Sequence, residues 1–207
     1  KMFGCMHALL LAKASTHLLD VNGRNAQQWA GGKGQPSTAE LIHQHEPQSL
    51  HLASVAARPD AGDAAVSSPA SLPHEIHLSA RRGELRKVVK WLGKGGPVDA
   101  LYTGSGRDGR AVTATLLHTA AISGHLEMVR ELLKLGASVD SQNNLGTTAL
   151  MGAALHGHLS TLLLLLQHSA NPDLPHLEGH TALMLAAGKG QEACVQALLR
   201  AEANTEL

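Results

Sequence analysis

The chain has 207 residues, of which 43% are apolar and only 2% aromatic, and it carries a formal net charge of +0. This length is enough for one or two domains with a sizeable core, and the predominance of Leu, Ala and Val favours closely packed helices over a β-sandwich. The balanced charge argues against binding to nucleic acid or to an anionic membrane. Two cysteines, Cys5 and Cys194, are too few for a dense disulfide framework.

The first residues, KMFGCMHALLLAKAST, have the features of a secretory signal: a basic residue, an apolar stretch and small residues at 12 and 14. However, residues 5–18 match residues 194–207 at eight of fourteen positions. Residues 23–35 match residues 179–191 at seven positions. Because no signal could act at residues 194–207, we interpret the opening segment as part of a fold.

Two further segments complete the first third of the chain. Residues 38–45, TAELIHQH, predict a short helix whose polar end suits the outer face of a terminal unit. Residues 47–73 are rich in Ala, Ser and Pro and predict a flexible linker, with a short helix conceivable over residues 50–57.

Residues 115–207 repeat with a period of 33 residues. Each copy has a leading threonine that can cap a short helix, an Ala-Ala pair that permits close packing, and a glycine that ends the helix. A second helix follows, with apolar residues at helical spacing. The landmarks are Thr115, Thr148 and Thr181, then Ala120-Ala121, Ala153-Ala154 and Ala186-Ala187, then Gly124, Gly157 and Gly190, then Leu132-Leu133, Leu165-Leu166 and Leu198-Leu199.

An earlier copy begins at His74 and keeps the glycine as Gly83. Gly83 and Gly124 are 41 residues apart, so eight extra residues lie between these copies. They fall in LYTGSGRDGRAVTA, residues 101–114, which we expect to be a Gly-rich loop.

These copies resemble the ankyrin repeat. The family's T-P-L-H-x-A signature is present as residues 115–120, TLLHTA, and in degraded form from residues 148, 181 and 74. The Gly-His pair between helices is present as Gly124-His125 and Gly157-His158. The resemblance implies an all-α fold, an ankyrin-type solenoid of helical hairpins with β-turn-like loops. Residues 74–207 then form about four repeats, and residues 1–46 form the C-terminal part, about one and a half repeats, of an array.

The order of these parts suggests a circular permutation. Residues 19–46 continue the pattern that stops at Leu207, so they could fold back over the open face at that end. The 27 residues of the linker can span up to about 90 Å when extended, which is longer than four stacked repeats. Residues 5–18 would compete with residues 194–207 for the same place, so the fit cannot be complete.

Ankyrin repeats bind partner proteins through hairpin tips and the exposed face of the first helices, which line a concave groove. For this chain the resemblance implies binding through these positions and through the loop at Tyr102. The tip residues are Asn143, Asn144, Leu145, Thr147, His176, Leu177, Glu178 and His180. The residues of the first helices are Thr119, Ser123, Met151, Leu155, His156, Met184, Leu185 and Lys189.

No other motif predicts a chemical site. The fourteen histidines include the pairs His43/His45 and His156/His158, which lack the Cys or carboxylate pattern of a zinc site and are interpreted as structural or solvated. GSGRDG at residues 104–109 does not lie in a βαβ unit, and the GGKG and GKGG stretches lack the Ser or Thr of a P-loop. We therefore predict no catalytic residue, cofactor or metal. The two cysteines are expected to pack in the core, and a basic first repeat is expected to be a solvated end face.

The sequence thus predicts a non-catalytic scaffold that binds another protein. The alternative is that these repeats recruit substrates within a larger enzyme, such as a kinase or a ubiquitin ligase; a third reading is a decayed or purely structural array. We expect a cytoplasmic or nuclear monomer without nucleic-acid or membrane partners. Fold alone does not identify the partner.

Overall fold

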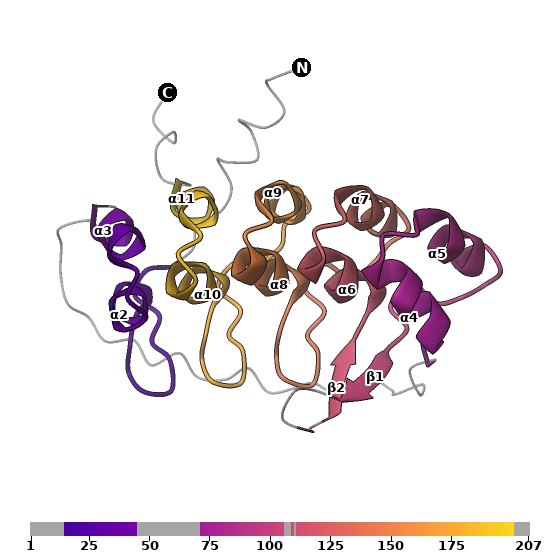
Figure 1. The fold of residues 1–207 in the computed structure, drawn as a ribbon, viewed down its shortest axis with the longest axis horizontal. Helices are drawn as coiled ribbons and strands as arrows, with labels where there is room; N and C mark the ends of the chain where they lie inside the picture. The colour runs from indigo at the N-terminus through magenta and orange to yellow at the C-terminus, as the bar shows by residue number, and fades with distance from the viewer. Residues whose placement is uncertain (1–14, 45–70, 106–108, 110, 201–207) are drawn as a thin grey trace, which may run out of the picture.

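The computed structural model describes residues 15–44, 71–105, 109 and 111–200. Within these ranges the helices form two rows that stack side by side, as Figure 1 shows. The helices are α2 (Ala26–Gly32), α3 (Pro36–Gln44), α4 (His74–Arg81), α5 (Leu85–Leu92), α6 (Leu116–Ile122), α7 (Leu126–Lys134), α8 (Ala149–His156), α9 (Leu159–Gln167), α10 (Ala182–Gly188) and α11 (Glu192–Leu199), and the strands are β1 (Tyr102–Ser105) and β2 (Ala111–Ala114). The all-α solenoid predicted from the sequence is confirmed.

The helix boundaries follow from the repeated threonines and glycines. The hydroxyls of Thr115, Thr148 and Thr181 each accept a hydrogen bond from the backbone N–H three residues later, which caps α6, α8 and α10. After the same helices, Gly124, Gly157 and Gly190 adopt φ values of 72°, 74° and 69°. This left-handed conformation suits glycine and lets the chain turn at once into the second helix.

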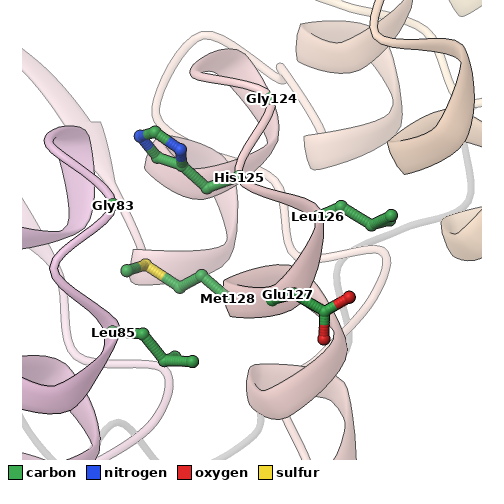
Figure 2. Close-up of a pocket in the computed structure, with 7 residues that line it drawn as sticks. All are labelled: Gly83, Leu85, Gly124, His125, Leu126, Glu127 and Met128. Carbon is green, nitrogen blue, oxygen red and sulfur yellow. The ribbon is translucent and has the colours of Figure 1, made fainter.

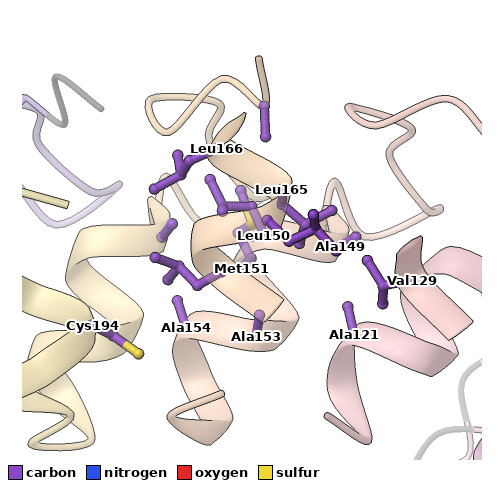
Figure 3. Packing of buried hydrophobic residues seen from close by; sticks show 14 of the residues in the cluster. Ala121, Val129, Ala149, Leu150, Met151, Ala153, Ala154, Leu165, Leu166 and Cys194 are labelled. Carbon is purple, nitrogen blue, oxygen red and sulfur yellow. The ribbon is translucent and has the colours of Figure 1, made fainter. Parts of the chain in front are cut away.

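The core runs through the whole stack as one cluster of small and branched side chains. Figure 3 shows its centre, where Leu150, Met151 and Leu165 lie between the neighbouring hairpins. The first helices of the hairpins, α4, α6, α8, α10 and α2, form the inner row, and the second helices, α5, α7, α9, α11 and α3, form the outer row (Figure 1). The Ala-Ala pairs of α6, α8 and α10 are at most 1% exposed, so these inner helices approach one another closely. No hairpin could bury these side chains alone, and stability therefore comes largely from contacts between neighbours.

The segment between the first two copies is more regular than the Gly-rich loop expected from the sequence. β1 and β2 form an antiparallel two-stranded sheet in which Tyr102 pairs with Ala114 and Ser105 with Ala111. The extra residues lengthen a hairpin tip instead of interrupting the stack (Figure 1). Alternation of partly buried and exposed residues along β1 fits a ribbon that contacts the molecule on one side only.

Residues 15–44, the described part of the N-terminal segment, lie at the far end of the array, beyond the last hairpin in the sequence (Figure 1). Helix α2 packs on α10, and α3 packs on α11. Thr38 of α3 donates a hydrogen bond from its hydroxyl to the carbonyl oxygen of Ala187, at 3.0 Å. Nearer the start of the chain, the Ser15 amide donates to Asp173, at 2.7 Å. The spatial order of the hairpins is therefore α4–α5, α6–α7, α8–α9, α10–α11 and then α2–α3.

This arrangement agrees with the hypothesis that residues 19–46 fold back over the end of the array. The contacts are those of α2 with α10 and of α3 with α11. The competing residues 5–14 and 201–207 lie outside the described residues. Residues 45–70, which include most of the expected linker, also lie outside them. The division of the chain at residues 46 and 73 therefore stays a prediction.

Candidate partner-binding surface

The hairpin tips form a continuous row along one edge of the stack (Figure 1). The Leu177 amide donates to the Leu145 carbonyl oxygen at 2.9 Å, and the Val21 amide donates to the Glu178 carbonyl oxygen at 3.1 Å. These bonds join three successive tips, the last of which belongs to the N-terminal segment. The row thus crosses from one part of the sequence to another without a break.

Each tip is held by a polar side chain at the same position. The Asn143 Oδ1 atom accepts bonds from the amides of Leu145 and Thr147, both at 2.9 Å. His176 takes this place in the next tip, where its Nδ1 atom accepts from the Glu178 amide at 3.1 Å. Asp20 takes it in the last, where it accepts from the amides of Asn22 and Arg24. Such side-chain-to-backbone bonds rigidify tight turns, so the tips are preformed.

The row of tips presents apolar side chains to solvent. Leu177 is 66% exposed and Val21 is 68% exposed, and Leu19 beside the last tip is 58% exposed. Leu177 and Val21 occupy the same position in successive tips, because each donates its amide to the tip before it. Nearby exposed apolar side chains are typical of protein interaction sites. Sequence analysis identified Leu177 but missed Leu19 and Val21, since their place beside it depends on the permuted packing.

Tyr102 and Asn144 contact the molecule more than sequence analysis suggested. The Tyr102 ring stacks on His77 with centroids 3.8 Å apart, and its hydroxyl lies 2.9 Å from His74 Nδ1. Asn144 accepts a bond from the Thr113 amide at 2.8 Å and donates to the Ala111 carbonyl oxygen at 2.7 Å. Both residues therefore fix the long hairpin, and each keeps only part of its surface for a partner.

Four of the predicted binding residues are buried. Met151 and Met184 are each 1% exposed and lie in the core cluster, so they are not accessible to a partner, which corrects their assignment to the groove. They are the third residue of α8 and α10, a position that faces the neighbouring hairpin. Thr119 and His180 are also buried. The others reach solvent wholly or in part, namely Tyr102, Ser123, Asn143, Asn144, Leu145, Thr147, Leu155, His156, His176, Leu177, Glu178, Leu185 and Lys189.

An aromatic anchor on α2 was missed by sequence analysis. The Trp29 ring is partly buried and lies between two cations, with Arg24 at 4.2 Å and Lys33 at 4.9 Å from the ring centroid. The ring also lies 4.4 Å from the buried His180 ring, centroid to centroid, and packs against Gly188 of α10. Trp and Arg are enriched among residues that dominate binding energy. The alignment of residues 23–35 with 179–191 places Trp29 on a first helix, which was the available signal.

The opposite ends of the hairpins are occupied by a ladder of side chains. His125 bonds to the Arg81 carbonyl oxygen and His158 to the Ile122 carbonyl oxygen, each at 3.0 Å from Nε2. The structural role expected for these histidines is confirmed, as is that of His118, which bonds to the Thr147 carbonyl oxygen at 2.8 Å. Beside His125 an open pocket of about 350 Å³ lies between the first two hairpins, as Figure 2 shows. The pocket is lined by Gly83, Leu85, Gly124, His125, Leu126, Glu127 and Met128.

The same ladder shows that the N-terminal segment is in register with the repeats. A Cβ atom at Gly83 or Gly124 would collide with His125 or His158 of the following hairpin. At Gly157 it would meet Gln191, and at Gly190 it would meet Gln35 of the N-terminal segment. Gln35 therefore occupies the place that the Gly-His histidine holds elsewhere.

The tip at residues 176–180 also gathers titratable groups. His180 Nδ1 lies 3.7 Å from a Glu178 oxygen, and His180 Nε2 lies 3.7 Å from Asp20 Oδ2. Burial by itself raises the pKa of Asp20, but hydrogen bonds from Arg24 and Asn22 and the Arg24 charge outweigh it and lower that pKa to about 2. Burial lowers the pKa of His176. Asp20 is therefore a buried, ionised carboxylate beside His180.

Cys194 is 1% exposed, as the expected packing role requires, and burial raises the pKa of its thiol to about 11. A thiol in this state is a poor nucleophile. Cys5 lies outside the described residues.

Comparison with protein families agrees with this architecture. The family model for ankyrin repeats (3 copies) matches residues 76–176 and 117–207. The chain belongs to the ankyrin repeat family. No curated protein matches it. Ankyrin repeats are generally protein–protein interaction modules. In the part of the chain that the structure describes, no helix has the length and apolar character needed to cross a membrane.

Proposed function

We propose that this ankyrin repeat protein binds a partner protein through the row of hairpin tips and the adjoining exposed side of the inner helices. The observation that carries the proposal is the apolar tip pair Leu177 and Val21, which is exposed on preformed turns. A rigid surface loses little conformational entropy on binding, so exposed apolar side chains on it contribute effectively to affinity.

The composition of this surface indicates the kind of partner. Trp29 on α2 and Arg24 just before this helix lie beyond the last tip, and they add a tryptophan and an arginine, neither of which occurs in α6, α8 or α10. A partner segment with apolar residues and an acidic residue would match both features. A recruiting role within a larger enzyme would use the same surface.

Affinity capture from a cell extract, followed by mass spectrometry, tests this proposal. Leu177→Asp places a charge on the exposed tip without touching the core. The matched control is Leu135→Asp, because Leu135 is 50% exposed but lies at the end of α7 in the outer row. We expect a partner that is captured by the native protein and by Leu135→Asp and lost with Leu177→Asp. A partner lost equally with both variants, or with neither, would contradict the assignment to the tips.

A further inference from the structure

The residues 176–180, HLEGH, bring together three metal-ligating side chains at one tip. One nitrogen of His176, one oxygen of Glu178 and one nitrogen of His180 lie within 4.8 Å of one another. We propose that these three residues bind a divalent transition-metal ion of the Zn²⁺ class. Two imidazoles and a carboxylate are a ligand set that zinc uses in proteins, with a further position left for water.

The backbone holds this ligand set in place. The His176 amide donates to the His180 carbonyl oxygen at 2.9 Å, and the Gly179 amide donates to the His176 carbonyl oxygen at 2.8 Å. The two neighbouring tips clamp the turn from either side through the Leu177 and Val21 amides. The rings of His176 and His180 lie nearly parallel, at an angle of 10° and a centroid distance of 5.6 Å. A ligand set on so short and fixed a turn loses little entropy when it binds an ion.

Each ring nitrogen of His180 faces a carboxylate. Its Nδ1 atom is directed toward Glu178, and its Nε2 atom is directed toward the buried carboxylate of Asp20, 3.7 Å away. Histidines that bind a metal through one nitrogen usually donate the other N–H to a carboxylate, which fixes the tautomer. Asp20 lies on this side of the His180 ring at 3.7 Å, which is longer than a hydrogen bond, and Arg24 holds its carboxylate through two bonds of 2.9 and 3.0 Å.

A modest rearrangement completes the site. Zinc bonds of about 2.1 Å place tetrahedral ligands roughly 3.3 Å apart, so the three groups must move closer. Glu178 can do so because 67% of its side chain is exposed. If His176 binds through Nδ1, the metal replaces the hydrogen bond that this atom accepts from the Glu178 amide, whereas binding through Nε2 leaves that bond in place. That bond is exposed, so water can replace the lost acceptor, and the exchange costs little.

The other close histidine pair serves as an internal comparison. His156 and His158 are two residues apart in the sequence, against four for His176 and His180, and their rings stack at a centroid distance of 6.1 Å. However, His158 Nε2 lies 3.0 Å from the Ile122 carbonyl oxygen, His156 Nδ1 lies 3.0 Å from the Gly152 carbonyl oxygen, and no carboxylate joins them among the clusters of the described residues. Proximity of two imidazole rings alone therefore does not make the site.

Titration of the full chain with Zn²⁺ by calorimetry tests the proposal, with circular dichroism to check folding. We expect one equivalent to bind and the affinity to fall more than about tenfold in His176→Ala and Glu178→Gln. The control His156→Ala should leave the affinity within about twofold, and Glu178→His, which replaces one ligand by another, should restore it relative to Glu178→Gln. Equal loss in the control, or full affinity in Glu178→Gln, would overturn the proposal.

Cobalt provides a readout of geometry. Co²⁺ bound by a tetrahedral nitrogen and oxygen set should give visible absorption that Zn²⁺ displaces, and Glu178→Gln should abolish it. Because Glu178 lies on the surface, this variant can lose the metal without losing the fold. The result is independent of the capture experiment, since that experiment substitutes Leu177 and reads partner binding.

Discussion

The two ends of the array are closed in different ways. At one end, the hairpin of α4 and α5 and the residues that follow each helix expose six basic side chains, Arg81, Arg82, Arg86, Lys87, Lys90 and Lys94. Of α5 only Val88 is buried. At the other end, α2 and α3 bury Ala26, Ala30, Thr38 and Ile42 against the last hairpin. The first end presents charged side chains to solvent, whereas the second is closed by a segment from the opposite end of the sequence.

The comparison shows that continuity of the chain is not needed for a solenoid. Each hairpin interacts with its neighbours only, so a hairpin that is delivered from elsewhere in the sequence contributes the same contacts as one that follows directly. The chain also carries one tryptophan at each end, Trp91 on α5 and Trp29 on α2, which lets each end be followed separately.

Removal of residues 1–46 should produce the largest effect. It exposes the faces of α10 and α11 that α2 and α3 cover, and burial of Ile42 alone contributes about 2 kcal/mol. We expect the free energy of unfolding in urea to fall by at least about 3 kcal/mol, with a lower melting temperature. Adding residues 15–46 as a separate peptide should restore part of the loss. Unchanged stability after the deletion would show that the N-terminal segment does not close this end.

A glycine substitution isolates the contact between the two parts of the sequence. Gly190 and Gly34 occupy the same position after a first helix, with φ of 69° and 71°, so alanine is strained at both by about 1 kcal/mol. A Cβ atom at Gly190 would also collide with Gln35, whereas a Cβ atom at Gly34 would have no neighbouring atom within 4 Å. Gly190→Ala should therefore cost more than Gly34→Ala in urea unfolding, by about 1 kcal/mol at most, because the clashing atoms are the end of the flexible Gln35 side chain, which can turn aside.

The double variant Gly190→Ala with Gln35→Ala is the control for this prediction. Shortening Gln35 removes the collision, so most of the excess destabilisation should disappear relative to the Gln35→Ala single variant. If the two glycine variants were equally destabilised, Gln35 would not contact Gly190 in solution.

Sequence reasoning predicted those features that depend on local chemistry. The three threonine caps, the left-handed glycines and the helix pairs all follow from residues that lie within one period, and they were visible in a single chain. The burial of Met151 and Met184 was not predicted, because the resemblance gives a helix face but not how closely the neighbouring hairpin covers it. The two strands were also missed, since YTGS and AVTA are short and are separated by glycines.

Contacts between distant residues were the hardest to predict. The His176-x-Glu178-x-His180 spacing is visible in the sequence, but Asp20 joins it only because the N-terminal segment folds back. The repeat alignment indicated that such packing was possible, whereas the pairing of Gln35 with Gly190 required coordinates. Side-chain contacts between the N-terminal segment and the last repeats therefore could not be predicted from the alignment.

Acid should open the α2–α3 end through Asp20. The folded pKa of about 2 lies below the ordinary value of 3.8, so the ionised carboxylate stabilises the fold fully above about pH 4. That stabilisation is lost as the pH falls from about 4 toward 2, when the folded state must also take up the proton. Glu84, at the other end, has a pKa that is lowered by its bonds with Lys87 and Ser79, but this carboxylate lies nearer the surface.

Fluorescence separates the two ends in this acid transition. A Trp91→Phe protein reports on Trp29 and a Trp29→Phe protein reports on Trp91. Salt screens the surface pair of Glu84 with Lys87 more than the buried bonds of Asp20 with Arg24. At high salt the fluorescence of Trp29 should therefore still change below pH 4, whereas the fluorescence of Trp91 should no longer change in that pH range. Asp20→Asn removes the titrating group, so the Trp29 change should vanish in that variant; if it persists at the same pH, the acid response belongs to another carboxylate.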